Sequence, residues 1–156
     1  MRVAIGLGAN LGDRLATLRE ATARIARLTN VVARSHVWET EPVGGPEQPR
    51  FLNAALLVEW GGEPIALLEG LMVIEAELGR VRHVPNGPRT IDLDVLWIEG
   101  VVVEHPRLVV PHPRLHLRAF ALGPMLEVAP GAVDPRTGEL LHAPDDPGAR
   151  RLDLEL

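Results

Sequence analysis

A strand that carries two acids constrains the fold of this chain more than any other stretch. From Ile91 to Ile98, apolar side chains at 91, 93, 95 and 97 lie on one face of the predicted strand, and Asp92 and Asp94 lie on the other. This is the period-two pattern of a β-strand. Residues two apart share a face, so the two carboxylates point the same way, roughly 6–7 Å apart along the strand. Because like charges repel and burial raises the cost, a metal ion or an arginine is expected to compensate them.

Two interpretations of this acid pair remain open from the pattern alone. The first places Asp92 and Asp94 on the solvated face of an edge strand, because acids usually stay in water. The second makes them ligands: the strand is otherwise apolar, aspartate is disfavoured in strands, and Arg89 precedes the first acid by three positions. Hard oxygen ligands of this kind suit Mg²⁺, which takes one or two carboxylates plus substrate phosphates.

The remaining patterns predict the order of elements around this strand. The predicted elements are, in order, strand 2–7, helix 13–28, strand 31–40, strand 51–60, helix 64–78 and the acid-bearing strand. This β-α-β-β-α-β order predicts an α+β, ferredoxin-like antiparallel sheet with both helices on one face. C-terminal additions follow: short extended pieces at 101–103 and 107–110, a helix over 116–126, a turn-rich end with one hairpin, and a mobile acidic tail.

The length and composition predict a single domain and indicate which partners and location to expect. The 156 residues are 46% hydrophobic, enough for one core spanning 1–156, with the tail beyond about 143 peripheral. A net charge of −5 argues against a general nucleic-acid binder. Because no signal-like or membrane-spanning apolar run is present, we expect a soluble, cytoplasmic protein with no membrane partner.

Missing residue types exclude several mechanisms. Cysteine is absent, which removes disulfides, thiolate chemistry and Cys-ligated zinc. Lysine is absent too, so Schiff-base catalysis and a P-loop lysine are excluded. All 16 basic residues are therefore arginines, which bind phosphate or carboxylate in a bidentate fork. This favours anion handling, although any single arginine is by default a solvated surface charge.

Two local features allow more than one interpretation. The glycine-rich stretch 6–13 matches neither the Walker nor the Rossmann spacing, so we expect a strand-to-helix turn capped by Asn10 or Asp13. Glu75 falls on the apolar stripe of its predicted helix. A carboxylate there indicates either a partly exposed edge position or a site residue.

The stretch Gly87-Pro88-Arg89-Thr90-Ile91-Asp92-Leu93-Asp94-Val95-Leu96 resembles the signature of the 6-hydroxymethyl-7,8-dihydropterin pyrophosphokinase family. Members of that family move a pyrophosphoryl group from ATP to a pterin alcohol in the folate pathway. Further stretches at 5–13, 41–44, 48–55 and 110–114, with Arg118 and Phe120 following, resemble the family in the same order. Together they cover nearly the whole chain apart from the tail.

The resemblance implies a role for each matching position. Asp92 and Asp94 would hold two Mg²⁺ ions that bridge the ATP phosphates, with Arg80 and Arg89 completing the catalytic group. The implied ATP contacts are Glu75, Arg82, Arg107, His112 and Arg118. The implied pterin contacts are Thr40, Pro42, Val43, Phe51, Asn53 and Phe120, with the two phenylalanines on opposite faces of the ring.

The implied reaction is attack of the pterin hydroxymethyl oxygen on the β-phosphorus of ATP, with AMP leaving. Loops near 41–50 and 80–88 would close over the site to exclude water. We expect a monomer whose partners are the pterin and ATP, with no nucleic acid.

Two rival functions remain from the residues alone. One is a two-metal nucleotidyltransferase or nuclease that uses the same acids and releases pyrophosphate or cuts nucleic acid. The other is a non-catalytic ferredoxin-like sensing or RNA-binding module, which predicts basic or aromatic residues on the open sheet face.

Overall fold

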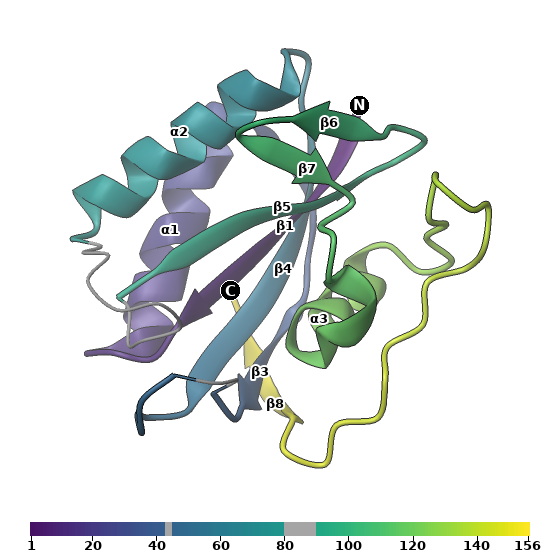
Figure 1. The fold of residues 1–156 in the computed structure, drawn as a ribbon. Helices are drawn as coiled ribbons and strands as arrows, with labels where there is room; N and C mark the ends of the chain where they lie inside the picture. Colours follow the sequence, from purple (N-terminus) through teal and green to yellow (C-terminus); the bar gives the residue numbers. More distant parts are fainter. Residues whose placement is uncertain (43–44, 80–89) are drawn as a thin grey trace.

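Six antiparallel strands form the centre of the molecule, with helices on both sides (Figure 1). The computed structural model describes residues 1–42, 45–79 and 90–156. The sheet order is β5-β1-β4-β3-β8, and β2 also pairs with β4. The elements are β1 (Arg2–Ala9), α1 (Arg14–Leu28), β2 (Asn30–Arg34), β3 (His36–Thr40), β4 (Phe51–Glu59), α2 (Pro64–Glu77), β5 (Asp92–Ile98), β6 (Val103–His105), β7 (Leu108–Val110), a short 3₁₀ helix (Leu115–Leu117), α3 (Ala119–Val128) and β8 (Arg150–Glu155).

The face covered by α1 and α2 holds the larger part of the core. Alternate residues of β1, including Val3 and Ile5, point to this face and are fully buried. From α1 they meet Leu18 and Ile25, and from α2 Leu71. The predicted order and the predicted antiparallel sheet with these two helices on one face are confirmed.

Among the described residues, the opposite face of the same strands is covered only in part, by the C-terminal helix α3. Leu122 and Met125 of α3 pack on Ala4, Leu57 and Leu96 of the sheet. The C-terminal additions therefore complete a second, smaller core. The ends of β1, β4 and β5 that lie beyond α3 are left for the site.

The predicted continuous strand over 31–40 is wrong in one respect, because the structure divides it at Ser35 into β2 and β3. The Ser35 hydroxyl donates to the carbonyl of His36 (2.7 Å) and accepts the amide of Ala55 (2.8 Å). A side chain thus replaces a regular ladder bond and breaks the strand. Both halves still pair with β4.

The expected mobile acidic tail is also wrong, because its last residues form β8 beside β3. Leu152 and Leu156 pack against the main core, and Arg19 donates to the carbonyl of Glu155 at 3.0 Å. The period-two leucines of the tail were the signal for a strand. The expected hairpin before it is present as a bridge between Val133 and Leu140.

Helix boundaries differ from the sequence prediction mainly near the site. Asp13 caps α1 through the amide of Ala16 (3.1 Å), whereas Asn10 turns to the segment before β4. The helix predicted over 116–126 is a 3₁₀ turn followed by α3, with Arg118 at the junction. Within the described residues, no helix is both long and apolar enough to cross a bilayer.

Candidate functional site

Two glycines of β1 form the floor of the site. Gly8 pairs with Asn53 of β4 on one side and with Asp92 of β5 on the other, and Gly6 likewise lies beside Asp94. Neighbouring strands are about 4.8 Å apart, so side chains on β4 and β5 stand on either side of β1. Because glycine has no side chain, the central strand leaves a hollow between them.

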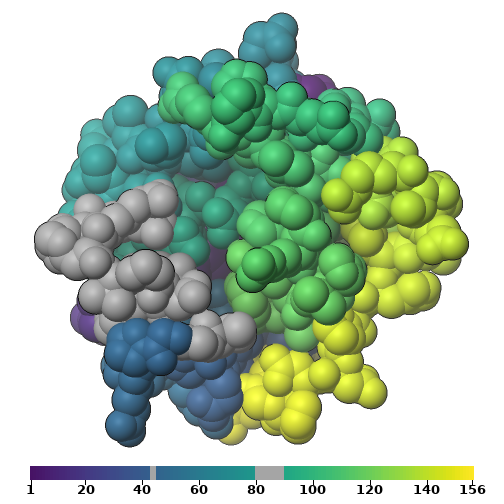
Figure 2. Space-filling model, in the orientation of Figure 1, coloured from purple at the N-terminus to yellow at the C-terminus, as the bar shows by residue number. Residues whose placement is uncertain are grey.

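A pocket of about 300 Å³ occupies this hollow. Figure 2 shows the depression beside α3. Its lining comes from five parts of the chain: Gly6, Leu7, Gly8, Thr40, Glu41, Phe51, Asn53, Ala54, Asp92, Asp94, Leu96, Arg114, Leu117, Arg118, Phe120 and Ala121. Seven of the residues predicted from the sequence meet here, namely Thr40, Phe51, Asn53, Asp92, Asp94, Arg118 and Phe120.

The two acids lie together on the pocket wall formed by β5. Asp92 and Asp94 are both half-buried, while Leu93 between them is buried on the opposite face. The strand is at the edge of the sheet, as the solvated interpretation required. The acids nevertheless line the pocket, so the face of β5 that carries them is the face turned toward the candidate site.

Glu75 supports the acid-bearing strand from the other side of the sheet edge. It is 97% buried in α2, and its Oε2 accepts the amide of Leu93 at 2.9 Å. Leu93 lies between the two acids, so this bond fixes the backbone that carries them. Glu75 is not a pocket residue, and the partly exposed position considered for it is wrong.

A turn before α3 brings basic groups to the pocket. Arg114 and Arg118 both line it, and the Arg118 guanidinium lies 5.6 Å from the ring centroid of Phe120. His112 is half-buried beside them. Burial first, and then the charges of Arg118 and Arg114, lower the pKa of His112 to about 4, although Asp92 opposes this.

The hydrogen bonds of His112 define its tautomer. Its Nδ1 accepts the backbone amide of Arg114 at 3.1 Å. The neutral ring therefore carries its proton on Nε2 and can donate a hydrogen bond. Near neutral pH this turn can therefore donate to an anion from the neutral His112 ring and from the charged guanidinium groups of Arg114 and Arg118.

The ends of β3 and β4 form the other side of the pocket. Thr40 and Asn53 are buried, and the Asn53 amide donates to the Thr40 hydroxyl. The Asn53 Oδ1 lies over Gly8, 2.8 Å from where a Cβ would stand. Phe51 is half-buried in the lining. This side combines one aromatic face with a fixed carboxamide, which suits a flat, hydrogen-bonding ring.

Several predicted site residues are not part of this pocket. Arg107 is exposed in the β6–β7 turn, where it pairs with Glu69 of α2 at 3.7 Å. Pro42 follows the lining residue Glu41 but does not line the pocket itself. His112 also does not line the pocket, although the charges of the lining residues Arg114 and Arg118 act on it. Arg80, Arg82, Arg89 and Val43 lie outside the described residues, and their predicted roles stay predictions.

With this geometry in view, the chain can be compared with known proteins. Residues 4–130 match the family described as 7,8-dihydro-6-hydroxymethylpterin-pyrophosphokinase (HPPK). The chain belongs to this family.

Individual relatives agree with the family match. A 2-amino-4-hydroxy-6-hydroxymethyldihydropteridine pyrophosphokinase of Methylorubrum extorquens is 46% identical over 134 residues, covering 85% of each chain. The Bacillus subtilis protein of the same name is 44% identical over 126 residues, covering 80% of this chain and 75% of its own. These matches support the pterin reaction and not the nucleotidyltransferase or nuclease alternative.

A solved structure supports the fold alone. A crystal structure of Plasmodium falciparum HPPK-DHPS superposes with a TM-score of 0.62 at 12% identity, covering 90% of this chain and 42% of that one. At this identity the likeness extends to the arrangement of strands and helices and no further.

Some pocket residues were not singled out by sequence reasoning. Arg114 and Glu41 belong to stretches that resemble the family, but neither side chain was assigned a role. Gly6 fell where the predicted strand and turn overlap, and Gly8 was interpreted as part of the turn, whereas both are strand residues of the pocket floor. The available signal was their alternation with Ile5 and Leu7, which places them on the face opposite the core.

The donor set of the pocket suits a magnesium ion bound together with phosphates. Among the described residues, no group of three or more His, Asp or Glu side chains is arranged to hold a metal on protein ligands alone. Asp92 and Asp94 supply hard oxygens on one face. One or two carboxylates completed by water and phosphate oxygens is the usual set for Mg²⁺.

Proposed function

We infer that the chain transfers pyrophosphate from ATP to the hydroxymethyl group of 6-hydroxymethyl-7,8-dihydropterin, releasing AMP, as a diphosphotransferase of folate biosynthesis. One observation carries the assignment to this pocket. Asn53 and Asp92 flank the same glycine of β1, so a ring-binding group and a metal-binding group face one hollow. Family membership supplies the reaction.

We propose that the β3–β4 side binds the pterin. Phe51 and Phe120 enter the pocket from different elements, β4 and α3, and would stack on the two ring faces. The Asn53 carboxamide, held by its bond to Thr40, would pair with the polar edge of the ring. Pro42 and Val43 would add backbone contacts beside Thr40.

The β5 side and the turn before α3 would bind the triphosphate. Asp92 and Asp94 would hold two Mg²⁺ ions, which when bound neutralise phosphate charge and make phosphorus more electrophilic. Arg118 is a donor on the adjacent wall, and the Nε2–H of His112 is a donor in the same turn; both are suited to phosphate oxygens. Arg80, Arg82 and Arg89 would add phosphate contacts and Arg107 a nucleotide contact, whereas Glu75 would act indirectly by holding the Leu93 backbone between the two acids.

This chemistry asks little covalent work of the protein. The substrate hydroxyl is itself the nucleophile, so positioning and charge neutralisation carry the reaction. The loops at 41–50 and 80–88 would exclude water and so suppress ATP hydrolysis. We also propose that the protein acts as a cytoplasmic monomer and without nucleic acid, because both substrates are small molecules.

The decisive experiment is product analysis with purified protein, ATP, Mg²⁺ and the reduced pterin alcohol. The expected products are AMP and the pterin pyrophosphate in equal amounts, with neither formed when the pterin is omitted. Release of pyrophosphate would indicate a nucleotidyltransferase, formation of ADP with a pterin monophosphate an ordinary kinase, and release of free phosphate with ADP an ATPase. Any of these results would contradict the proposal.

A further inference from the structure

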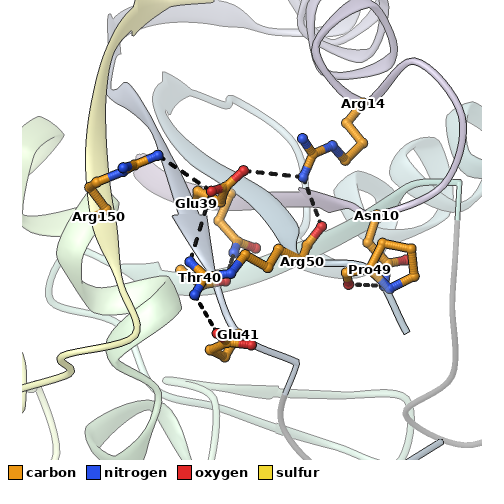
Figure 3. Close-up of polar contacts among 9 residues, drawn as sticks. Asn10, Arg14, Glu39, Thr40, Glu41, Pro49, Arg50 and Arg150 are labelled. Atoms are coloured by element: carbon orange, nitrogen blue, oxygen red, sulfur yellow. Dashed lines mark hydrogen bonds and ion pairs between the residues drawn. The ribbon is translucent and has the colours of Figure 1, made fainter. Parts of the chain in front are cut away.

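A charged cluster lies behind the proposed pterin side of the pocket (Figure 3). The chain leaves β3 after Thr40 and returns at Phe51, and these two residues are paired across the strands. Arg50 comes directly before Phe51. Its position therefore sets where an aromatic wall of the pocket begins.

Arg50 is held through both its backbone and its guanidinium group. Its carbonyl accepts from Arg14 of α1 at 2.9 Å. Its guanidinium pairs with Glu41 through a short contact and approaches Glu39 at 3.8 Å. The pair with Glu41 joins the two ends of the 41–50 connection, and Glu41 itself lines the pocket. Arg50 thus touches one lining residue and is bonded to another.

Glu39 anchors this arrangement from the far side of the sheet. Its carboxylate is 19% exposed and lies within 4 Å of three arginines: Arg14 at 3.5 Å, Arg50 at 3.8 Å and Arg150 at 3.6 Å. These come from α1, the connection and β8. One carboxylate shared by three cations favours a fixed geometry more than an isolated surface pair does.

The C-terminal segment 145–156 contributes twice to this arrangement. Arg150 of β8 is register partner to Glu39 and also pairs with its carboxylate. Gly148 lies so close to Glu41 that a Cβ there would stand 2.9 Å from the Glu41 Cγ. The family match ends at residue 130, so this support comes from a part of the chain outside the family pattern.

We propose that Arg50 is a positioning residue for the pterin side of the pocket, and that the C-terminal segment 145–156 braces it through Glu39 and Glu41. This inference rests on the proposed assignment of the β3–β4 side to the pterin. Arg50 touches no substrate. It orients Phe51 and Glu41, and the nucleotide side, built from β5 and the turn before α3, does not depend on it.

The test compares binding of the two substrates to Arg50→Met, which keeps an unbranched stem of similar bulk and removes the guanidinium and its charge. Calorimetry with the pterin alcohol is expected to show a Kd about 10-fold higher, since small displacements in a fitted site are costly. The Kd of a non-hydrolysable ATP analogue with Mg²⁺ should stay within about 2-fold, because that side is independent. Arg150→Met should weaken pterin binding in the same direction, by about 2- to 3-fold, as expected of an exposed pair.

Arg151→Met is the matched control. It removes the same charge from the neighbouring position of β8, and within the described residues its side chain is in no hydrogen bond or ion pair. It should leave both Kd values unchanged. If Arg50→Met does not fold, Glu41→Gln removes the same pair from its other end and should give the same selective loss. In a Glu41→Gln background, Arg50→Met should cost less than it does alone.

Equal weakening of both ligands, or no change in either, would overturn the inference. A wild-type protein that forms no AMP would overturn the proposed function, and this inference with it. A wild-type protein that forms AMP, together with an Arg50→Met variant that binds pterin normally, would overturn the inference alone.

Discussion

The two faces of the central strands differ although they belong to the same stretches of chain. On the side of α1 and α2, β1 presents Val3 and Ile5 and is fully packed. On the other side it presents Ala4, Gly6 and Gly8, and α3 covers only the first part. Alternating large with small residues lets one strand hold a core on one face and a pocket on the other. Stability and chemistry are thereby assigned to opposite faces.

The largest expected effect is on the pocket face, at Asp92. Asp92→Ala should lower turnover by at least about 1000-fold, because phosphate charge neutralisation by a held metal contributes several kcal/mol. The fold should remain, since the change removes one of two repelling carboxylates. Rates at saturating Mg²⁺, together with Tm, check both statements.

Asp153→Ala is the control for this prediction, because it removes an exposed aspartate from β8. It should leave turnover unchanged. Full activity of Asp92→Ala with Mg²⁺ present would defeat the assignment of this acid to the metal.

On the packed face, Ile25→Ala should reduce stability rather than chemistry. Ile25 is fully buried in α1, and removing such a side chain costs about 2–5 kcal/mol through lost burial and a cavity. Urea unfolding measures the loss. Val73→Ala, at a position of α2 that is 59% exposed, should change stability by less than about 0.5 kcal/mol. A large change in the KM for the pterin or ATP in the folded Ile25→Ala protein would contradict the assignment of stability to one face and chemistry to the other.

A pair of glycine substitutions tests the pocket floor. A Cβ on Gly8 would stand 2.8 Å from the Asn53 Oδ1, whereas one on Gly6 would meet the end of Leu96 at 3.0 Å. Gly8→Ala should therefore raise the KM for the pterin by about 10-fold, the scale of a lost polar contact. Gly6→Ala should have the smaller effect on the pterin KM, because a leucine can rotate away. Equal pterin KM values for the two variants would contradict the placement of Asn53.

The smallest effect concerns how α3 is held over the pocket face. Glu127 of α3 pairs with the Nδ1 of His36 at 2.7 Å and accepts the indole N–H of Trp38 at 2.6 Å. Burial alone would raise the pKa of Glu127, but these bonds outweigh it and the net pKa is lowered. The ionised form is thus favoured by folding, and its stabilisation is present above the unfolded pKa and lost as pH falls through the folded pKa.

Glu127→Gln should therefore lose about 1–2 kcal/mol near pH 7, the scale of hydrogen bonds to a charged group. The difference from wild type should shrink as the pH falls below the usual pKa of a glutamate, about 4.3. Unfolding by urea at a series of pH values measures this. A difference that does not depend on pH would show that the charge of Glu127 is not what holds α3.

Local pattern was sufficient to predict most elements, because each depends on neighbours in sequence. The period-two runs predicted β1 and β5, the apolar run 51–60 predicted β4, and the Pro64 start predicted α2. The shared face of Asp92 and Asp94 follows from the same period. The strand break at Ser35 was missed because it depends on a hydroxyl bond to Ala55, far away in the chain. The strand β8 was missed although its alternating leucines were visible locally, and only its pairing with β3 is long-range.

The sequence by itself thus determined the order of elements, the family resemblance and the face on which the acids stand. Only the tertiary structure decided which residues meet across β1: Asn53 and Asp92 on either side of Gly8. The reason is physical. Alternation along a strand determines which face a side chain occupies, but register and neighbour are chosen by packing of the whole sheet. The same packing brought Arg150 of the C-terminal strand to Glu39, which no local pattern could show.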